Sequence, residues 1–509
     1  MSSVDLVIRN SNIITMDGNL SRKNWIAIKD GIIHDVGNGG LNDVDTGSVI
    51  DGEGKTVLPG LIDCHVHSSM TGIGQRGIDL SGIDSVKGIL DKVNEFCLKI
   101  PGDKVICGCN MNMPQTITEG RLPTRYELDE VTGDHPVMLV LWTAHGGCLN
   151  SKAIDHANLT EGMKSVEKEG FFNEDEISFH VIGNIYNLMT DKDFEEIYVN
   201  IAKECATKGI TTIHSLDGMM VKDDRDTEVL KKIMDELIIE IVPYTQTFDY
   251  QKIQRYGLKQ IGGCLSVDGS PPQLTGAYSN PYPMAPHTRG FLTYTDKELY
   301  DFVTAATKAG LQTAFHAIGD RAVDQIIYIY QQVDREIGIK DLRHRIEHFS
   351  TPTDQHIEMA AEMNIVASAQ PVIGDMQDGE SGNGFEAFAP PKIAAYHENF
   401  ARVIRGGVTV CGGSDSPVTP MDCFKGLNSC VNAYNEKRRV SLDDALKMYT
   451  VNAAYAAHEE NKKGSLEKGK QADMIIIDKD PYKEEGEIDR SVIKVEKTIK
   501  KGKIIFESS

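Results

Sequence analysis

The stretch Val57–His67, VLPGLIDCHVH, decides how the rest of the chain is interpreted. Its apolar residues are interrupted by Pro59-Gly60 and end in two histidines. Side chains alternate along an extended segment, so His65 and His67 project from one face. Two imidazoles on one face at a strand end can bind one metal ion. Because H-x-H alone also fits satisfied or surface histidines, the prediction of a metal site depends on ligands elsewhere in the chain.

The bulk properties describe a large acidic protein of ordinary globular composition. Its 509 residues favour one large α/β domain with a smaller companion. A net charge of −22 without a basic block argues against nucleic acid and membranes as partners. No signal peptide or membrane span is apparent, and ten cysteines are too sparse for a disulfide framework. We expect a cytoplasmic protein that acts on a small molecule and forms a homo-oligomer, expected to be a dimer.

Both ends of the chain are rich in short strand patterns. Residues 4–56 and residues 472–506 each alternate apolar runs with Gly- or Asn-containing turns. Neither end supplies enough strands for a stable sheet alone. We therefore predict a discontinuous β-sandwich of residues 1–57 and 460–509, beside a central domain of residues 58–459.

Between these ends, buried-type strands alternate with helical patterns, which predicts parallel βα units. With the strand before His65, eight candidate strands are enough to close a (β/α)8 barrel. The other seven are Gly209–His214, Leu237–Pro243, Gly262–Val267, Gln312–His316, His344–His348, Ile365–Ala369 and Val408–Cys411. Barrel enzymes place their active sites at the C-terminal ends of such strands.

Insertions interrupt this pattern. Residues 68–200 far exceed an ordinary βα connection and contain their own strand, Val137–Trp142, and a helical stretch, Leu90–Lys99. We predict that they form a subdomain over the barrel mouth. Two Pro/Gly-rich loops, Ser270–Gly290 and Pro371–Pro391, are predicted to act as lids.

Ligand-type residues stand at four strand ends. His65 and His67 close the first strand, and His316, His348 and Asp415 follow later strands, each beside a Gly-rich or polar turn. One such residue would usually be structural. Four strand ends that agree within one barrel predict a shared metal site.

Several longer stretches then give a family resemblance. They are VLPGLIDCHVH, GITTIHS, FHAIGDRAVD, RIEHFS, QPV, GGSDSPV, LDDALKMYTVNAAYA, which is expected to form one helix, and GSLEKGKQADMIIID, between residues 50 and 480. Through them the chain resembles the metal-dependent amidohydrolases, and within that superfamily the YtcJ-like branch, amidohydrolase family 3. The resemblance implies a distorted TIM barrel beside a β-sandwich, with a large insertion after the first barrel strand.

The resemblance also implies site residues and a reaction. One or two divalent metal ions, usually zinc, would be bound by His65, His67, His316 and His348. Asp415 would contact the metal-activated water as general base and then protonate the leaving group. We therefore predict hydrolysis of a C–N bond in a small amide, formamide or cyclic amide.

One position departs from the family pattern. The branch typically has a lysine four residues ahead of the aspartate of D-G-S, and related two-metal enzymes use a carbamylated fourth-strand lysine as a bridge. Here Cys264 occupies that position, and Lys259 is out of register. A thiolate is a good zinc ligand and can bridge two ions. Cys264 is predicted to bind metal; the alternative is a small buried residue beside a single-metal site.

A second departure lies in residues 142–151, WTAHGGCLNS. The branch resembles D-G-H-x-x-W-x-N-S here, so His145 matches, whereas Thr143 and Cys148 replace Asp and Trp. We predict that His145 faces the substrate carbonyl or a polar substituent in a catalytic and substrate-binding role; a structural histidine is the alternative. Cys148 is expected to reshape the substrate pocket.

Other residues leave alternatives open. Asp268 is a candidate for lining the substrate pocket. Glu347 is expected to point opposite His348, into the layer between barrel and helices. Arg343 and Arg345 either bind a carboxylate substrate or pair with the acidic surface.

Two other functions compete with amide hydrolysis. A mononuclear hydrolytic deaminase would act on a small heterocycle, but such enzymes usually add a glutamate acid, and none stands at the matching motif positions. A non-catalytic scaffold would be expected to have lost ligands, whereas every ligand at the strand ends is present.

Overall fold

The computed structural model describes residues 3–39, 45–100, 102, 104–142, 146–159, 163–172, 175–219, 221–379, 384–387, 389–482 and 489–508. They form two compact units. The first is Met1–Val66, Ala202–Leu216 and Met234–Ser509, and the second is His67–Ile201 and Asp217–Ile233. The second unit contains the predicted insertion 68–200, while the boundary between sandwich and barrel stays a prediction. In the described ranges, no helix has the length and apolar character needed to cross a membrane.

The first unit contains the predicted parallel eight-stranded barrel. Its strands run in the order β18-β17-β16-β15-β14-β13-β12-β6, and a bridge between Val66 and Ser416 joins the two ends. Each strand overlaps a predicted one. Their bounds are β6 Leu61–Val66, β12 Ile210–Ser215, β13 Glu240–Thr245, β14 Gln260–Ser266, β15 Gln312–Ala317, β16 Arg345–His348, β17 Val366–Ala369 and β18 Thr409–Gly412.

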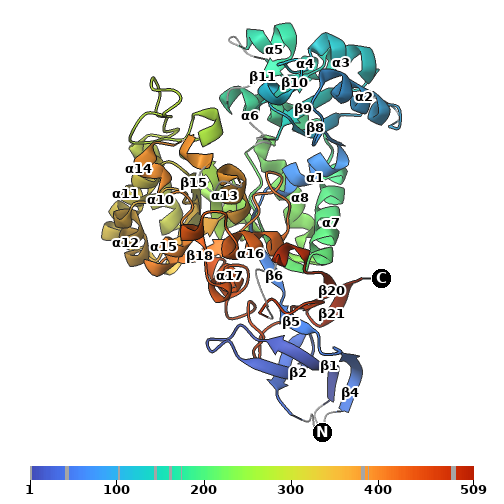
Figure 1. Cartoon of the computed structure of the whole chain (residues 1–509), viewed down its shortest axis with the longest axis vertical. Helices are drawn as coiled ribbons and strands as arrows, with labels where there is room; N and C mark the ends of the chain where they lie inside the picture. Colours follow the sequence, from blue (N-terminus) through green and yellow to red (C-terminus); the bar gives the residue numbers. More distant parts are fainter. Residues whose placement is uncertain are drawn as a thin grey trace. The chain divides into compact units, whose positions relative to one another are not determined.

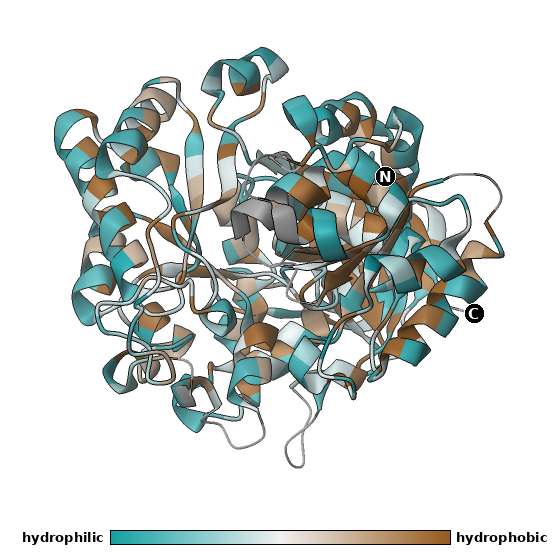
Figure 2. Cartoon of the chain, turned by 90° about the horizontal axis from the view of Figure 1, so that it is seen from above, coloured by the Kyte–Doolittle hydropathy of each residue, from teal (hydrophilic) through white to brown (hydrophobic). Residues whose placement is uncertain are grey.

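The barrel strands are short apolar runs because a parallel sheet is buried on both faces. Every residue of β6, β12 and β16 is buried. Amphipathic helices cover the outside, and in α11 (Asp320–Ile337) Val323, Ile327 and Tyr330 are buried at helical spacing. Figure 2 shows hydrophobic residues on the strands and inner helix faces, with hydrophilic residues on outer turns. Further helices are α9 Tyr250–Tyr256, α10 Asp296–Lys308, α12 Asp354–Glu362, α14 Pro391–Ala394, α15 Phe400–Arg405 and α16 Cys423–Val431.

Both ends of the chain build one further sheet, as predicted. Its order is β21-β20-β19-β5-β1-β2-β3, with β4 on β1. The N- and C-terminal halves join where β5 pairs antiparallel with β19, and Figure 1 shows blue and red strands together there. The bounds are β1 Ser3–Ile14, β2 Arg22–Lys29, β3 Ile32–Gly37, β4 Asp45–Asp51, β5 Thr56–Pro59, β19 Met474–Ile477, β20 Val495–Lys500 and β21 Lys503–Glu507.

The second unit has its own sheet, ordered β11-β10-β9-β8-β7. The predicted strand and helix of this segment are present as β9 Val137–Leu141 and α2 Val86–Cys97. Leu139 and Val93 are fully buried in its hydrophobic core. The other elements are β7 Ile78–Asp79, β8 Ile106–Met111, β10 Gly147–Leu149, β11 Phe171–Phe172, α1 Ser68–Arg76, α3 Arg125–Thr132, α4 Ser151–His156, α5 Lys164–Glu169, α6 Asp175–Tyr186 and α8 Arg225–Ile233. Helix α7, Asp191–Thr207, begins in this unit.

Two sequence expectations need correction. The predicted loop Pro371–Pro391 begins with a helix, α13 Pro371–Asp378, because proline is well tolerated at a first helical position. The stretch LDDALKMYTVNAAYA forms two helices, α17 Leu442–Met448 and α18 Val451–Ala456. At the break between them, the Tyr449 carbonyl accepts a hydrogen bond from the Ile62 amide of the first barrel strand.

Candidate metal centre

Five predicted site residues lie at the C-terminal end of the barrel in the first unit. His65 and His316 each precede the last residue of a strand, β6 and β15, and His348 ends β16. Cys264 lies near the end of β14, and Asp415 follows β18. Parallel strands present their C-terminal ends at the same edge, which explains why residues so distant in sequence share one site.

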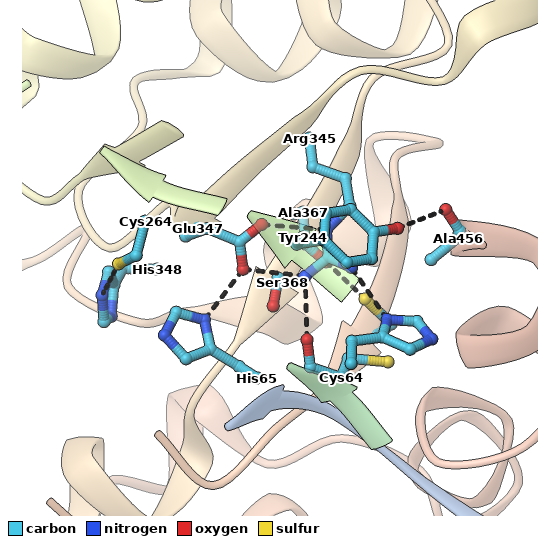
Figure 3. A network of polar contacts seen from close by, with 12 residues as sticks. Cys64, His65, Tyr244, Cys264, Arg345, Glu347, His348, Ala367, Ser368 and Ala456 are labelled. Carbon is cyan, nitrogen blue, oxygen red and sulfur yellow. Dashed lines mark hydrogen bonds and ion pairs between the residues drawn. The ribbon is translucent and has the colours of Figure 1, made fainter. Parts of the chain in front are cut away.

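Three of these side chains converge closely. Ligand atoms of His65, Cys264 and His348 lie within 4.8 Å of one another, and all three residues are buried. Cys264 Sγ is 3.9 Å from His348 Nε2, and the His316 ring lies 4.5 Å from the His348 ring between centroids. Asp415 also lies close to this group, with Oδ1 3.1 Å from His65 Nε2. Figure 3 shows Cys264, His348 and His65 in this arrangement.

Two site residues have a left-handed backbone. His348 has φ 68° and Asp415 has φ 58°. This region is uncommon for residues with a side chain and costs about 1–3 kcal/mol, so it persists only where the surroundings enforce it. At His348 the left-handed backbone interrupts the regular alternation of side chains between the two faces of β16.

The expected direction of Glu347 is therefore wrong. Glu347 Oε2 lies 2.8 Å from His65 Nδ1, inside the barrel and beside the site. Arg345 and Glu347 are two apart in β16, so their side chains share the inward face. The left-handed backbone at His348 then turns the His348 side chain toward the same end of the barrel.

A buried network continues behind His65 (Figure 3). Arg345 donates to both carboxylate oxygens of Glu347, from Nε at 2.9 Å and from Nη2 at 2.8 Å. Arg345 Nη1 lies 2.8 Å from His214 Nδ1, and Nη2 donates to the Cys64 carbonyl at 2.9 Å. Arg345 is thus a fully buried internal residue, which neither alternative from the sequence describes.

Arg343 instead pairs with an acidic side chain. Its Nη2 and Nη1 lie 2.7 and 3.0 Å from the Glu460 carboxylate oxygens. The guanidinium also lies 3.6 Å from the centre of the Tyr455 ring. Of the two alternatives for Arg343, this arrangement favours pairing with an acidic group over substrate binding.

Burial and charge shift the pKa values at this site. Burial lowers the pKa of His65, but the charges of Asp415 and Cys264 raise it well above its ordinary value. Burial raises the pKa of Glu347, but Arg345 and the hydrogen bond to His65 lower it to about 2. Burial and the neighbouring His316 lower the pKa of His348. Glu347 is therefore a carboxylate, and the anionic groups around His65 favour a cation at this position, either a proton on the imidazole or a metal ion.

Asp268 holds the turns around His316. Its oxygens accept hydrogen bonds from the amides of Ala277 at 2.8 Å, Ile318 at 3.0 Å and Gly319 at 2.8 Å. Oδ1 lies 3.4 Å from His316 Nδ1, and Asp268 is fully buried. This position suits orientation of His316, and the predicted contact of Asp268 with substrate stays a prediction.

The remaining predicted residues belong to the second unit or lie outside the residues that the structure describes. His67 directly follows β6 and is the first residue of the second unit, so its role as a ligand stays a prediction. His145 and Thr143 lie outside the described residues. Cys148 is buried in the hydrophobic core of the second unit.

Sequence reasoning also missed a buried carboxyl. Glu398, 4% exposed, lines a small pocket with Pro371, Gly374 and Arg438. Burial raises the pKa of Glu398 to about 8, so it is largely protonated at neutral pH. It follows α14 in a segment without a recognisable motif, and no sequence signal would have found it. The inward pair Arg345 and Glu347 did have a signal, because two charged residues alternate within a buried strand.

The donor set at the barrel end fits a divalent metal ion. Each ring nitrogen of His65 faces an anionic oxygen, of Glu347 at 2.8 Å and of Asp415 at 3.1 Å. A neutral imidazole has one N–H and can satisfy only one of them. A cation shared by Nε2 and Asp415 would satisfy the other. Imidazole with thiolate is a donor combination that suits zinc.

Comparison with known proteins gives the same picture. Residues 48–506 match the model of the Amidohydrolase family. The chain is 25% identical to "Putative amidohydrolase YtcJ" of Bacillus subtilis, over 90% of each chain. It is 26% identical to "N-substituted formamide deformylase" of Arthrobacter pascens, over 94% of each chain.

A solved structure shares the fold. An uncharacterized metal-dependent hydrolase from Pyrococcus furiosus superposes with a TM-score of 0.78 at 26% identity. The match covers 94% of this chain and 100% of that one.

Proposed function

The chain belongs to the amidohydrolase family and is a hydrolase of C–N bonds, and we propose that it cleaves an amide, formamide or cyclic amide of a small molecule with the help of a divalent metal. The convergence of His65, Cys264 and His348 at the C-terminal end of the barrel carries this proposal. Burying several imidazoles and a thiol beside one another costs free energy, so a purely structural role explains this cluster poorly.

The proposed ligands are His65, His67, His316 and His348, with Asp415 beside them and zinc as the ion. Cys264 is proposed as a further ligand, and its participation decides between one ion and two. Support comes from the 3.9 Å separation of Cys264 Sγ and His348 Nε2. A thiolate at that position can bridge two zinc ions.

The proposed chemistry assigns a proton carrier to the chain itself. A divalent metal, when bound, supplies the Lewis acidity that makes water nucleophilic at neutral pH and polarises a carbonyl. Asp415 takes the proton of the attacking water and returns it to the departing nitrogen. The 3.1 Å contact between Asp415 Oδ1 and His65 Nε2 supports this role, because it holds the carboxylate at the site.

The substrate proposal draws on a relative. The Arthrobacter pascens protein is named for removing formyl groups from N-substituted formamides, so formamides are the first class to test. His145 is proposed to contact the substrate carbonyl or a polar substituent. The cytoplasmic location and the homo-oligomer stay predictions.

A substrate panel tests the proposal. Purified protein with one equivalent or more of zinc is incubated with N-substituted formamides, simple amides, cyclic amides and amino-heterocycles. Release of amine with formate or another carboxylate supports amide hydrolysis, whereas ammonia from a heterocycle alone supports the deaminase alternative. Absence of both metal and turnover would support a scaffold.

A further inference from the structure

The network behind His65 gives an inference that rests on the proposed metal site. We propose that Glu347 and Arg345 are positioning residues that hold His65 as its Nδ1–H tautomer, so that Nε2 is presented to the metal. Neither residue would contact the ion. Both would act through the imidazole, as outer partners of metal-binding histidines commonly do.

The donors and acceptors fix where the protons lie. A guanidinium can only donate, and Arg345 donates to both oxygens of Glu347 at 2.9 and 2.8 Å. A bidentate contact of this kind pairs a guanidinium with an ionised carboxylate, so Glu347 accepts from Arg345 as a carboxylate. Its further contact at 2.8 Å, with His65 Nδ1, then requires an N–H on that nitrogen. In a neutral imidazole this leaves the lone pair on Nε2.

The lone pair on Nε2 faces the candidate metal centre. His65 belongs to the ligand group with Cys264 and His348. On the same side, Nε2 lies 3.1 Å from Asp415 Oδ1. An imidazole lone pair against a carboxylate oxygen is repulsive unless a cation lies near both. The tautomer that Glu347 enforces is thus suited to the metal-bound protein.

Arg345 is itself held by several strands. Its guanidinium reaches His214 Nδ1 of β12 at 2.8 Å and the Cys64 carbonyl of β6 at 2.9 Å. It also lies 4.2 Å from the centre of the Tyr244 ring of β13. Because Arg345 donates, His214 Nδ1 must accept, so His214 carries its proton on Nε2. These contacts hold the Arg345 guanidinium in the orientation that positions the Glu347 carboxylate (Figure 3).

Stability alone is a weak explanation for this pair. Replacing a buried ion pair by apolar groups of similar volume is often neutral or stabilising, so a buried Arg–Glu pair is poor evidence of a stabilising role. Arg345 and Glu347 are both fully buried, in a barrel that is otherwise rich in apolar side chains. A positioning role predicts a change in metal affinity that a structural role would not produce.

The decisive variant is Glu347→Gln. Glutamine keeps the shape but has one carbonyl oxygen, so it cannot accept from Arg345 and His65 through both ends as the carboxylate does. The test has two readouts: zinc affinity, determined by chelator competition, and the visible spectrum of the Co²⁺-substituted protein. The expected result is zinc binding weaker by about 10–100-fold, with an altered Co²⁺ spectrum. Glu347→Gln with wild-type affinity and spectrum would overturn the inference.

Control variants separate positioning of His65 from the general effect of removing an ion-paired carboxylate. Glu240→Gln removes a carboxylate that pairs with Lys463 and Lys500, and it should leave zinc affinity unchanged. If Glu347→Gln does not fold, Arg345→Lys is the second variant. It keeps the positive charge but loses the paired donors of the guanidinium, so it should weaken zinc binding. The control Arg343→Lys should not weaken it. Equal zinc binding by the two lysine variants contradicts the inference. A wild-type protein that binds no metal would instead overturn the proposed function as well.

Discussion

Among the described residues, the barrel has an ionic cluster at each end of its strands, and the two clusters are built differently. At the start of β13, Glu240 pairs with Lys463 at 2.6 Å and with Lys500 at 3.2 Å. Lys463 also lies 2.9 Å from Glu459, and Lys500 lies 2.8 Å from Asp473. We call this group, at the N-terminal ends of the strands, the lower cluster, and the group at the C-terminal ends the upper cluster. The lower cluster joins the barrel to the sheet formed by the two chain ends.

The lower cluster is complete within the chain, since each buried lysine meets two carboxylates. The upper cluster has histidines and a thiol where the lower one has lysines. There His65 faces a carboxylate oxygen on each side, and a single neutral imidazole cannot satisfy both. The lower end is therefore complete as a stabilising ion-pair cluster, whereas the donor set of the upper end fits a cation. In barrel enzymes generally, the two ends divide these tasks in the same way.

Metal removal should separate the two ends most strongly. Dialysis against a chelator is expected to abolish amide hydrolysis, because the water would lose its activating Lewis acid. Zinc added back should restore the rate and raise the melting temperature, since a ligand that binds only the folded state stabilises it. Activity that survives in protein from which elemental analysis detects no metal would contradict the proposal.

The next largest effect is expected for Asp415→Asn. Loss of a positioned general base and acid should lower kcat by about 10²–10⁴-fold. Metal content, measured by elemental analysis, should remain close to that of the wild type. Asp473→Asn provides the control, because Asp473 belongs to the lower cluster and pairs with Lys500. Full activity of Asp415→Asn would end the assignment of this residue.

Cys264→Ser should give a smaller change that counts the ions. If the thiolate bridges two ions, the variant should retain one ion per chain and bind it about 10–100-fold more weakly, as for other perturbed metal sites. Cys205→Ser is the control, since Cys205 is buried beside Met421 away from the ligand group. One ion per chain in both the wild type and Cys264→Ser, with equal affinity, would show that no bridge exists.

The smallest effect on catalysis is expected at the lower cluster. Lys463→Met leaves Glu240 and Glu459 without this partner and should destabilise the fold by about 3 kcal/mol, measured by urea unfolding. The kcat of the folded protein should stay within about twofold, an effect of at most about 0.4 kcal/mol on the barrier. A large loss of kcat with full metal content would mean that the two ends are not independent.

The pH dependence of stability offers a further test of the same cluster. Burial raises the pKa of Glu240, but Lys463 and Lys500 lower it well below its ordinary value. A lowered folded-state pKa contributes stability above the unfolded pKa of about 4.3 and loses it as the pH falls toward the folded value. The wild type should therefore lose stability below about pH 4, and Lys463→Met should show a shallower decline. Parallel curves for the two proteins would contradict this account.

Much of the site followed from sequence because it depends on regular geometry. Period-two alternation placed His65 on a strand face, and parallel strands brought His316 and His348 to the same end. Glu347 was misjudged because alternation fails at His348, where the backbone is left-handed. A φ value of this kind is set by tertiary contacts and leaves no mark in the residue types.

Other features had no local signal at all. The lower cluster unites Glu240 with Lys463 and Lys500, which are far apart in the chain and lie in no shared motif. Glu398 is buried by α13 and α16, so its raised pKa depends on packing that the sequence does not display. Such residues become visible only once the outer helices and the terminal sheet are placed around the barrel.

The most direct test of the central claim is X-ray absorption at the zinc edge of the protein purified without added metal. The proposed zinc centre should show a stoichiometric ion with imidazole nitrogens at about 2.0–2.1 Å and one sulfur at about 2.3 Å. Protein that contains no stoichiometric metal, or metal without imidazole scattering, would contradict a metal centre at the upper end of the barrel.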